Sequence, residues 1–436
     1  MKSDEGLVRA VGVRGLSAGI VNYTIGAGIF VLPAVVAGRV GAAAWVVYII
    51  CALAMAAIVL CFADAGSRVS MSGGTYAYAG LAFGPFIGFI VAISLWFGSA
   101  VLASAAVSNV FVDTLAKLVP AFADPVWRAV TLVLLYATFT AVNIRGVRLG
   151  SGVVQTVTAA KLTPLLILIG IGLFFVRPEN LAWPGMPSSG ELARTSVILL
   201  FAFLGVEAAL TPSGEVKNPA KTVPKAIFVS LALVTLIYLA LQFVAQGILG
   251  SELAENATSP LAATAGRILG RTGEILVLVA TAISTLGYVA GDMLAAPRTV
   301  YALGRDRLLP SVFGSVHERF KTPHVAIVLH AVMCFGFAVT GSFTALIVLA
   351  TLAALIVYLI CCLATIQLQR LNIRAEGAIP FKVPGGPVIP VIASAIVIWL
   401  MSASTRQEFI AMGAMLAITS VLYLVMRMQN KGAAAL

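Results

Sequence analysis

The first long apolar run of the chain, residues 14–37, is interrupted by Ile25-Gly26-Ala27-Gly28-Ile29-Phe30. Glycine costs about 1 kcal/mol relative to alanine inside a helix, so two glycines at the middle of the run predict a local break. A later apolar run, residues 193–212, contains Phe201-Ala202-Phe203-Leu204-Gly205-Val206-Glu207, again with a glycine at its middle and now with a carboxylate beside it. The two interruptions decide how the rest of the sequence is interpreted.

The composition places these runs in a membrane. The 436 residues are 60% hydrophobic and 10% charged, with a mean hydropathy of +1.04, whereas soluble domains carry about 25% charged residues. A soluble enzyme, a nucleic-acid-binding protein and a disordered scaffold are therefore excluded. All five cysteines lie inside apolar runs and have no metal-ligand spacing, which argues against a disulfide framework or a zinc site; they are Cys51, Cys61, Cys334, Cys361 and Cys362.

Apolar runs long enough to span a bilayer predict an all-α polytopic membrane protein, since a spanning helix needs about 20 apolar residues. Twelve such helices are expected, at 14–37, 41–63, 82–112, 126–143, 151–176, 193–212, 224–250, 272–302, 324–341, 344–369, 387–404 and 408–427.

The basic residues predict the orientation of these helices. With the N-terminal tail, residues 1–13, in the cytoplasm, most of the 28 Lys and Arg residues fall on the inner side, as the positive-inside rule requires. An even number of helices returns the C-terminal tail, residues 428–436, to the cytoplasm. We expect a multi-pass protein of the cytoplasmic (inner) membrane.

The interruptions fall in the first helix of each of two five-helix sets, 14–176 and 193–369, followed by a helix pair at 387–427. An odd-numbered set followed by its copy must be inverted in the bilayer, so the pattern predicts a 5+5 inverted repeat. Paired interruptions of this kind mark transporter binding sites. Freed N–H groups suit a carboxylate and freed carbonyls suit an ammonium group. The alternative is that Gly-x-Gly serves only close helix packing.

Several segments resemble the amino acid–polyamine–organocation transporter superfamily, whose members share a LeuT-like fold with broken helices 1 and 6. The resemblance rests on Ile25 to Phe30, on Ser72-Gly73-Gly74-Thr75-Tyr76 with Phe83-Gly84-Pro85, on Phe203 to Glu207 with Glu215-Val216-Lys217-Asn218-Pro219, on Arg298 to Pro310, and on Phe381-Lys382-Val383-Pro384. Ala27 stands where the family usually has serine, which removes a hydroxyl that could touch a substrate carboxylate.

The resemblance implies a set of site residues. Substrate contacts are expected at Thr24, Gly26, Ala27, Gly28, Ser99, Phe201, Gly205 and Tyr288, and coupling or gating at Lys161, Glu207 and Ser284. The Lys161 ammonium group would replace a sodium ion between helix 1 near Gly28 and helix 8 near Ser284, either titrating during transport or staying charged.

Two intramembrane carboxylates leave their roles open. Glu207 is expected to gate the substrate amine or carry a proton, or else to bind neighbouring backbone. Asp292 either lines an inner vestibule or, the reading we favour, pairs with Arg298 or another inner-side base. Charged groups at this depth are functional candidates by default because they are costly to bury.

We therefore expect a sodium-independent secondary transporter of amino acids that works by alternating access, with proton symport or exchange. A polyamine or cationic amino acid exchanger, an amino-acid-sensing receptor and a passive channel are the alternatives. No phosphate-binding loop is present, and His317, His324 and His330 lie near one inner loop without a partnered nucleophile, so no enzyme is expected. The expected partners are the substrate and the lipid bilayer, without nucleic acid, metal or cofactor. A homodimer is compatible with the sequence.

Overall fold

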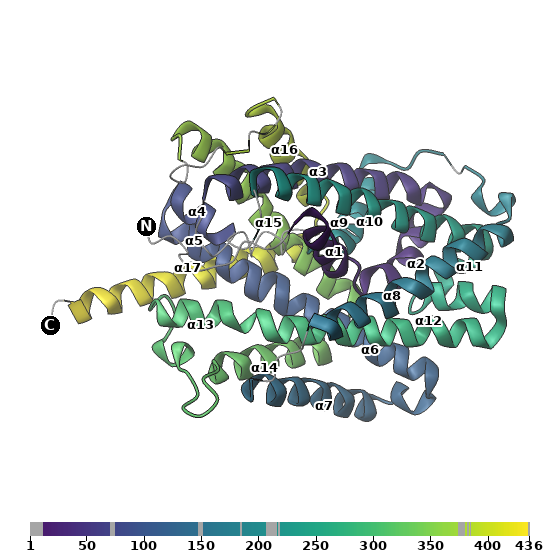
Figure 1. Ribbon diagram of the computed structural model, residues 1–436, viewed down its shortest axis with the longest axis horizontal. Coiled ribbons are helices and arrows are strands. Elements are labelled where there is room, and N and C mark those ends of the chain that lie inside the picture. The colour runs from purple at the N-terminus through teal and green to yellow at the C-terminus, as the bar shows by residue number, and fades with distance from the viewer. Residues whose placement is uncertain are drawn as a thin grey trace.

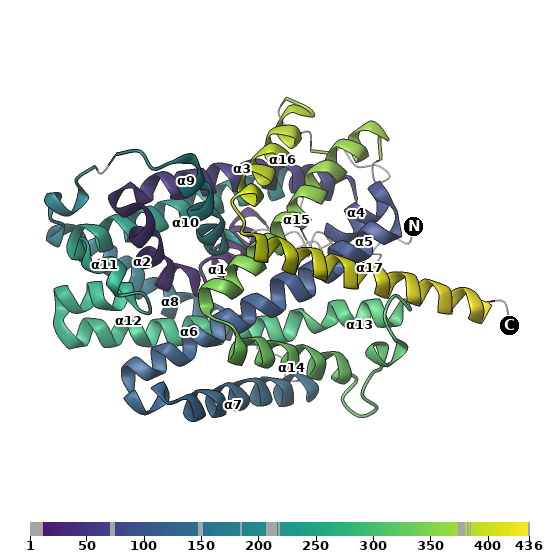
Figure 2. The same ribbon diagram turned by 180° about the vertical axis from the view of Figure 1, so that it is seen from behind.

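The fold is that of a computed structural model, which describes residues 12–69, 75–146, 151–183, 185–205, 216, 219–373, 380–381, 383 and 385–434. These residues form helices and no β-strand (Figures 1 and 2). The helices that flank the two interruptions are described below. The other α-helices are α3 (Ala44–Arg68), α4 (Thr75–Phe83), α5 (Pro85–Ile93), α6 (Leu102–Leu118), α7 (Pro125–Ile144), α8 (Ser151–Gly172), α10 (Pro219–Leu249), α11 (Glu252–Glu255), α12 (Pro260–Ala295), α13 (Pro297–Arg305), α14 (His324–Thr340), α15 (Phe343–Arg370), α16 (Val388–Ser402) and α17 (Arg406–Ala434).

The first predicted interruption is present. Helix α1 (Val13–Thr24) ends before the glycine pair, and α2 (Gly28–Val40) starts at its second glycine. The second interruption is also visible: α9 (Ser189–Leu200) passes through a 3₁₀ turn, η6 (Phe201–Phe203), to Gly205 at a φ of +105°. That φ favours glycine because it has no Cβ.

Seven helical stretches in the described part of the chain are long and apolar enough to cross a membrane. They are Gly28–Arg68, Pro85–Leu118, Pro125–Ile144, Lys221–Leu249, Pro260–Arg305, Phe343–Arg370 and Arg406–Asn430. Shorter apolar helices cover Ala160–Phe175, His324–Thr340 and Val388–Ser402. Large apolar side chains are exposed on these helices, including Leu134 at 62%, Leu236 at 65% and Ile418 at 69%, as expected for surfaces in contact with lipid.

Several helices differ from the sequence prediction in their bounds, and two of these differences coincide with changes in helix geometry. The helix expected at 82–112 starts at Pro85, after the turn at Gly84, and continues to Leu118 through a π-helical segment, η2 (Ser94–Val101). The helix expected at 272–302 is α12, which bends at Gly270 and stops at Ala295, where α13 begins with Pro297. Proline lacks an N–H and fits the first turn of a new helix.

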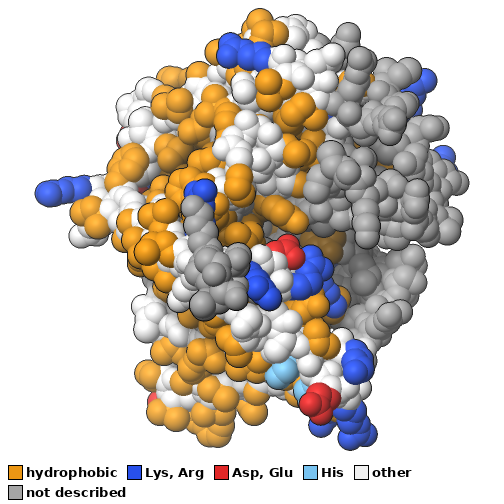
Figure 3. Space-filling model, turned by 90° about the vertical axis from the view of Figure 1, so that its left-hand side faces the viewer, with side chains coloured by type: hydrophobic (Ala, Val, Ile, Leu, Met, Phe, Trp, Pro, Cys, Tyr) orange, Lys and Arg blue, Asp and Glu red, His pale blue; other side chains and the backbone are white. Residues whose placement is uncertain are grey.

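The packing surrounds the first break with long helices. Helix α10 packs on α1 and α3, and α12 packs on α6 and α8. Helices α12 and α13 follow one another along one side of the molecule, next to α14 (Figures 1 and 2). Helices α4 and α13 and the C-terminal part of α17 lie at one end, and α11 lies at the other. On the former end, Lys and Arg side chains are spread more widely than Asp and Glu (Figure 3).

A buried carboxylate joins three parts of the chain at the end of α3. Asp64 has no exposed side-chain surface and forms an ion pair with Arg68. Its other oxygen accepts hydrogen bonds from Gln369 Nε2 at 3.0 Å and from Val383 N at 3.2 Å. Asp64 therefore connects α3 to α15 and to the segment that leads into α16.

Asp64→Asn is expected to lower the thermal unfolding midpoint of the detergent-purified protein clearly. The substitution leaves Arg68, 7% exposed, without its counter-ion, and breaking a buried ion pair on one side costs about 3–5 kcal/mol. Glu274→Gln is the control, because its partner Arg271 is 58% exposed and surface pairs contribute at most about 1 kcal/mol. Equal thermal unfolding midpoints for Asp64→Asn and Glu274→Gln would contradict the stabilising role of the buried Asp64–Arg68 pair.

Candidate functional site

The first break leaves backbone groups without helical partners in the interior. The Ile25 N–H still bonds to the Val21 carbonyl at 2.9 Å, and the Gly26 N–H turns back to the Thr24 carbonyl at 2.9 Å. Helix α2 then starts at Gly28, and the first N–H groups of a helix have no partner within it. An interior helix start of this kind favours a negatively charged group.

The two breaks pack directly against each other. A Cβ on Gly28 would lie 3.1 Å from Ala202 Cα, and a Cβ on Gly205 would lie 3.2 Å from the Tyr23 carbonyl oxygen. Both glycines therefore stand where backbone closely approaches the opposite break, and a side chain at either would need its neighbours to shift. Gly26 differs, because its added Cβ would meet only the Tyr288 ring, at an ordinary 3.8 Å.

Tyr238 of α10 joins the two breaks through its hydroxyl group. The hydroxyl lies 2.9 Å from the Thr24 carbonyl and 2.9 Å from the Ala202 carbonyl, so its single hydrogen is shared between them. The side chain is fully buried, and its ring meets that of Phe203 edge-on with centroids 5.3 Å apart. The sequence analysis missed this residue, since a tyrosine within an apolar helix gives no sign of what its hydroxyl contacts.

The expected substrate contacts are placed as follows. Gly26 and Tyr288 face each other, and Thr24 and Ala27 are buried at the break, with the Thr24 hydroxyl lacking a hydrogen-bond partner among the described residues. Phe201 is 8% exposed and meets the Phe343 ring edge-on at 6.3 Å.

Ser99 has no hydrogen-bond connection to the other expected substrate contacts among the described residues. It is partly buried in the π-helical segment η2, and no hydrogen bond in the described part of the chain connects it to either break. Glu207 lies outside the described residues.

Lys161 contacts the first broken helix. Its side chain is 5% exposed, and its Nζ donates a hydrogen bond to the Asn22 carbonyl at 2.5 Å. The contact is on α1, six residues before Gly28, where a position nearer Gly28 was expected. On the α12 side, the Ser284 hydroxyl is buried and has no hydrogen-bond partner among the described residues, so the expected bridge is seen only at its helix-1 end.

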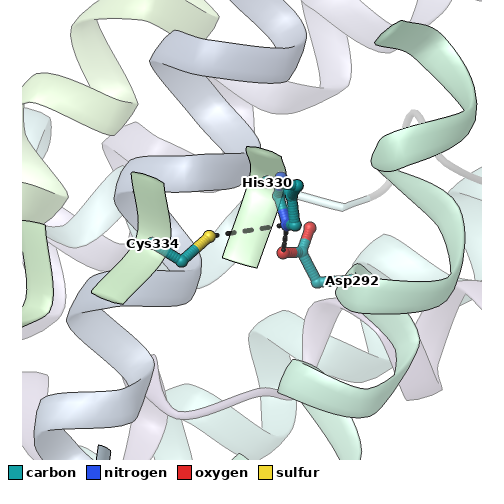
Figure 4. Close-up of side chains that lie close together, drawn as sticks. All are labelled: Asp292, His330 and Cys334. Atoms are coloured by element: carbon teal, nitrogen blue, oxygen red, sulfur yellow. Dashed lines mark hydrogen bonds and ion pairs between the residues drawn. The ribbon is translucent and has the colours of Figure 1, made fainter. Parts of the chain in front are cut away.

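Asp292 pairs with a base, as one of the two interpretations in the sequence analysis predicted. The base is His330 of α14. Asp292 Oδ2 lies 2.8 Å from His330 Nε2, and Cys334 Sγ lies 3.4 Å from the same nitrogen (Figure 4). His330 is fully buried inside α14. The sequence analysis grouped it with the inner loop and did not foresee the pairing.

The oxygen, nitrogen and sulfur atoms of this trio lie within 4.8 Å of one another, close enough to test as a metal site. Trp96 Nε1 is 3.2 Å from His330 Nδ1, and an indole N–H can only donate. Nδ1 must therefore be unprotonated and Nε2 must carry the hydrogen. A metal on Nε2 would need the opposite tautomer, with Nδ1–H donating to a nearby acceptor. The trio in this arrangement does not suit metal binding.

Comparisons with known proteins agree on one kind of molecule. A family described as amino acid permease matches residues 12–426. The chain is 28% identical to a methylthioribose transporter of Bacillus subtilis, over 92% of this chain and 90% of the relative. It is 27% identical to a branched-chain amino acid permease of the same organism, over 89% and 87%. It is 31% identical to the large neutral amino acids transporter small subunit 2 of Oryctolagus cuniculus, over 80% and 66%.

Tyr238→Phe is expected to loosen both breaks together. It removes the donor shared by two buried carbonyls, and a buried group left without its partner costs about 1–3 kcal/mol. Hydrogen–deuterium exchange should rise in peptides covering residues 20–30 and 198–205, and the thermal unfolding midpoint should fall.

Tyr136→Phe serves as the matched control. The Tyr136 hydroxyl is also buried but bonds to Ser108 at 2.7 Å, away from the breaks. Increased exchange confined to only one break in Tyr238→Phe would show that the shared hydrogen bond does not connect the two.

Proposed function

The chain belongs to the amino acid permease family, and from that premise we propose that it carries amino acids across the cytoplasmic membrane by alternating access. It is a transporter and not an enzyme, since the family and its named relatives are permeases and transporters. The observation that carries the proposal is the contact between the two interrupted helices, at Gly28 with Ala202 and at Gly205 with Tyr23. Two interruptions that meet in the interior offer N–H and carbonyl groups at one place.

The proposed architecture has twelve spanning helices in a 5+5 inverted repeat. The repeats would be residues 14–176 and 193–369, with a helix pair at 387–427 and cytoplasmic tails at 1–13 and 428–436. Support comes from the positions of the two breaks, near the start of each set, and from the apolar helices that follow them. The basic residues on the end that carries α13 and the end of α17 favour the cytoplasm for that side (Figure 3).

The proposed site takes the two ends of an amino acid at the breaks. The substrate carboxylate would meet N–H groups at Ala27 and Gly28, in the space that Gly26 leaves open, beside the Thr24 hydroxyl, which is buried without a partner among the described residues. The substrate amine would meet backbone carbonyls near Gly205, with Glu207 as a gate or proton carrier.

Aromatic residues would cover the bound substrate. Phe201 and Tyr288 lie at the second break and opposite Gly26, respectively, and aromatic faces provide apolar cover and can contact a cation. Ser99 would contact the substrate side chain. A homodimer remains compatible with this arrangement and is not required by it.

Sodium independence is proposed from Lys161. Its buried ammonium group bonds to a helix-1 carbonyl, which is the kind of oxygen that coordinates a sodium ion at a broken helix. A permanent cation held there, with the Ser284 hydroxyl of α12 as the other end of the proposed bridge, would make the sodium ion unnecessary. The driving force would then be a proton gradient or exchange.

A ligand screen tests the substrate class. Purified protein should be stabilised against thermal unfolding by one or more free amino acids, by about 2.7 kcal/mol at a hundredfold excess over the dissociation constant. Amides and decarboxylated analogues should stabilise it weakly, because each lacks a group that the breaks recognise. The screen includes methylthioribose, the substrate named for one relative, and polyamines.

Gly26→Leu in the same screen should abolish ligand stabilisation, since its side chain would fill the space before Tyr288. Gly170→Leu is the control, because Gly170 is exposed on α8 with open space around it. If a polyamine or methylthioribose stabilised the protein more than any amino acid, that compound would replace amino acids as the proposed substrate. Ligand binding without saturable counterflow in proteoliposomes would favour a receptor or a channel.

Lys161→Met should reduce uptake about tenfold or more, because a hydrogen bond to a charged group contributes about 1.5–3 kcal/mol and each 1.4 kcal/mol is a factor of ten. Ligand stabilisation should persist, since Lys161 bonds to Asn22 and not to the proposed site. Wild-type uptake should be the same with sodium or choline outside. Strict sodium dependence of the wild type would refute the cation role, and Lys161→Arg measures how much the charge alone restores.

A further inference from the structure

A buried carboxylate below the proposed substrate site is paired with a histidine and with no Lys or Arg. Asp292 is 9% exposed, and among the described residues its one ion-pair contact is with His330 (Figure 4). No described Lys or Arg forms an ion pair with it. Resting on the proposed transport function, we propose that Asp292 binds the proton that is carried with the substrate, and that His330 and Trp96 are positioning residues for it.

Trp96 fixes which group can take the proton. Its indole N–H donates to His330 Nδ1 at 3.2 Å, so the imidazole hydrogen lies on Nε2 and donates to Asp292 Oδ2. The imidazole is therefore neutral when the carboxylate is ionised. A proton could join Nδ1 only by displacing the indole, and Trp96 and His330 are 8% and 0% exposed, which leaves little room for water to replace it. The other oxygen, Oδ1 of Asp292, remains for the proton.

Several titratable groups on the helices that pack against α12 have partners other than Asp292. On α14 the Cys334 thiol contacts His330 Nε2, and on α7 the Tyr136 hydroxyl bonds to Ser108. On α8 Lys161 bonds to the Asn22 carbonyl, and on α10 Tyr238 bonds to the two break carbonyls. Arg298 on α13 forms no ion pair among the described residues. None of these groups forms an ion pair with Asp292 among the described residues, so none of them neutralises its charge by direct contact.

The position connects protonation to the substrate site. Asp292 follows Tyr288 by one turn of α12, and residues four apart share a helix face, while Tyr288 faces the first break. An ionised carboxylate in the membrane interior favours arrangements that admit water, and a protonated one tolerates closure. A hydronium ion on the outer side would transfer a proton to Oδ1, breaking one of its own O–H bonds as the new one forms. On the inner side the Oδ1–H bond would break as a water molecule accepts the proton.

Uptake in proteoliposomes with and without an imposed inward proton gradient tests the proposal. For each variant the readout is the ratio of the two rates, which is independent of its basal rate. The wild-type ratio should exceed one, and that of Asp292→Asn should equal one. Asparagine still accepts a hydrogen bond from His330 Nε2 but binds no proton. Asp306→Asn is the control, because Asp306 is 49% exposed and pairs, among the described residues, only with Arg305, and it should keep the wild-type ratio.

Trp96→Phe gives a second measurement that depends on the tautomer. Losing the indole N–H frees Nδ1, so the pair gains a further protonated form, His330 charged beside ionised Asp292. An added protonated form raises the proton affinity of the pair, and the midpoint of the uptake–pH profile should move to higher pH. A role confined to packing would lower the rate at every pH without moving the midpoint.

The outcomes separate the two proposals. Absence of amino acid counterflow in the wild type would refute the transport function. Counterflow with a wild-type ratio of one, or with an Asp292→Asn ratio equal to the wild type's, would overturn the proton-binding role alone. Ligand stabilisation of Asp292→Asn reports whether the variant is folded. Should it fail to fold, an unchanged pH midpoint in Trp96→Phe would overturn the proposal, and a shifted midpoint would support it.

Discussion

The structure depends on how backbone groups are satisfied where two helices are interrupted in an apolar interior. A polar group buried without a partner costs several kcal/mol in such surroundings, so an interruption persists only where other elements supply hydrogen bonds. The Tyr238 hydroxyl does this for Thr24 and Ala202 at once. The close approach of Gly28 to Ala202 makes the arrangement possible, because a single phenol can reach both carbonyls only when the two backbones nearly touch.

The same contacts determine which parts move together. Helix α1 is fastened to α10 by Tyr238 and by hydroxyl-to-carbonyl bonds between Ser17 and Ala226 and between Ser230 and Ser17. Lys161 holds it from α8 at Asn22. A displacement of α1 away from α8 would break only the Lys161 contact among these bonds, whereas a displacement away from α10 would break three. Motion of α1 with α10, relative to α8, is therefore the less costly direction for opening a proposed site at the break.

Local sequence predicted features that depend on residue type, and failed for features that depend on partners. The glycines of Ile25 to Phe30 predicted the first interruption because glycine disfavours a helix in any context, and Gly205 predicted the second in the same way. The apolar runs predicted a helical membrane protein. Tyr238 and the Trp96–His330–Asp292 chain were not foreseen, because their meaning comes from hydrogen bonds between helices far apart in the sequence. Asp292 was correctly expected to meet a base, but the sequence could not identify which one.

Two intramembrane charges are accommodated in different ways, which suits them to different tasks. Lys161 donates to the Asn22 carbonyl in the last turn of α1, so its charge would hold the helix that leads into the break without contacting the substrate. Asp292 pairs with His330, whose tautomer is set by Trp96. Asp292 also lies one helical turn from Tyr288, which faces the first break. The carboxylate can gain or lose a proton at Oδ1 while Oδ2 continues to accept the hydrogen bond from His330 Nε2–H. The imidazole therefore keeps one protonation state throughout. On the proposals above, a stationary cation and an exchangeable proton belong to separate groups, each suited to its role by the kind of partner that it has.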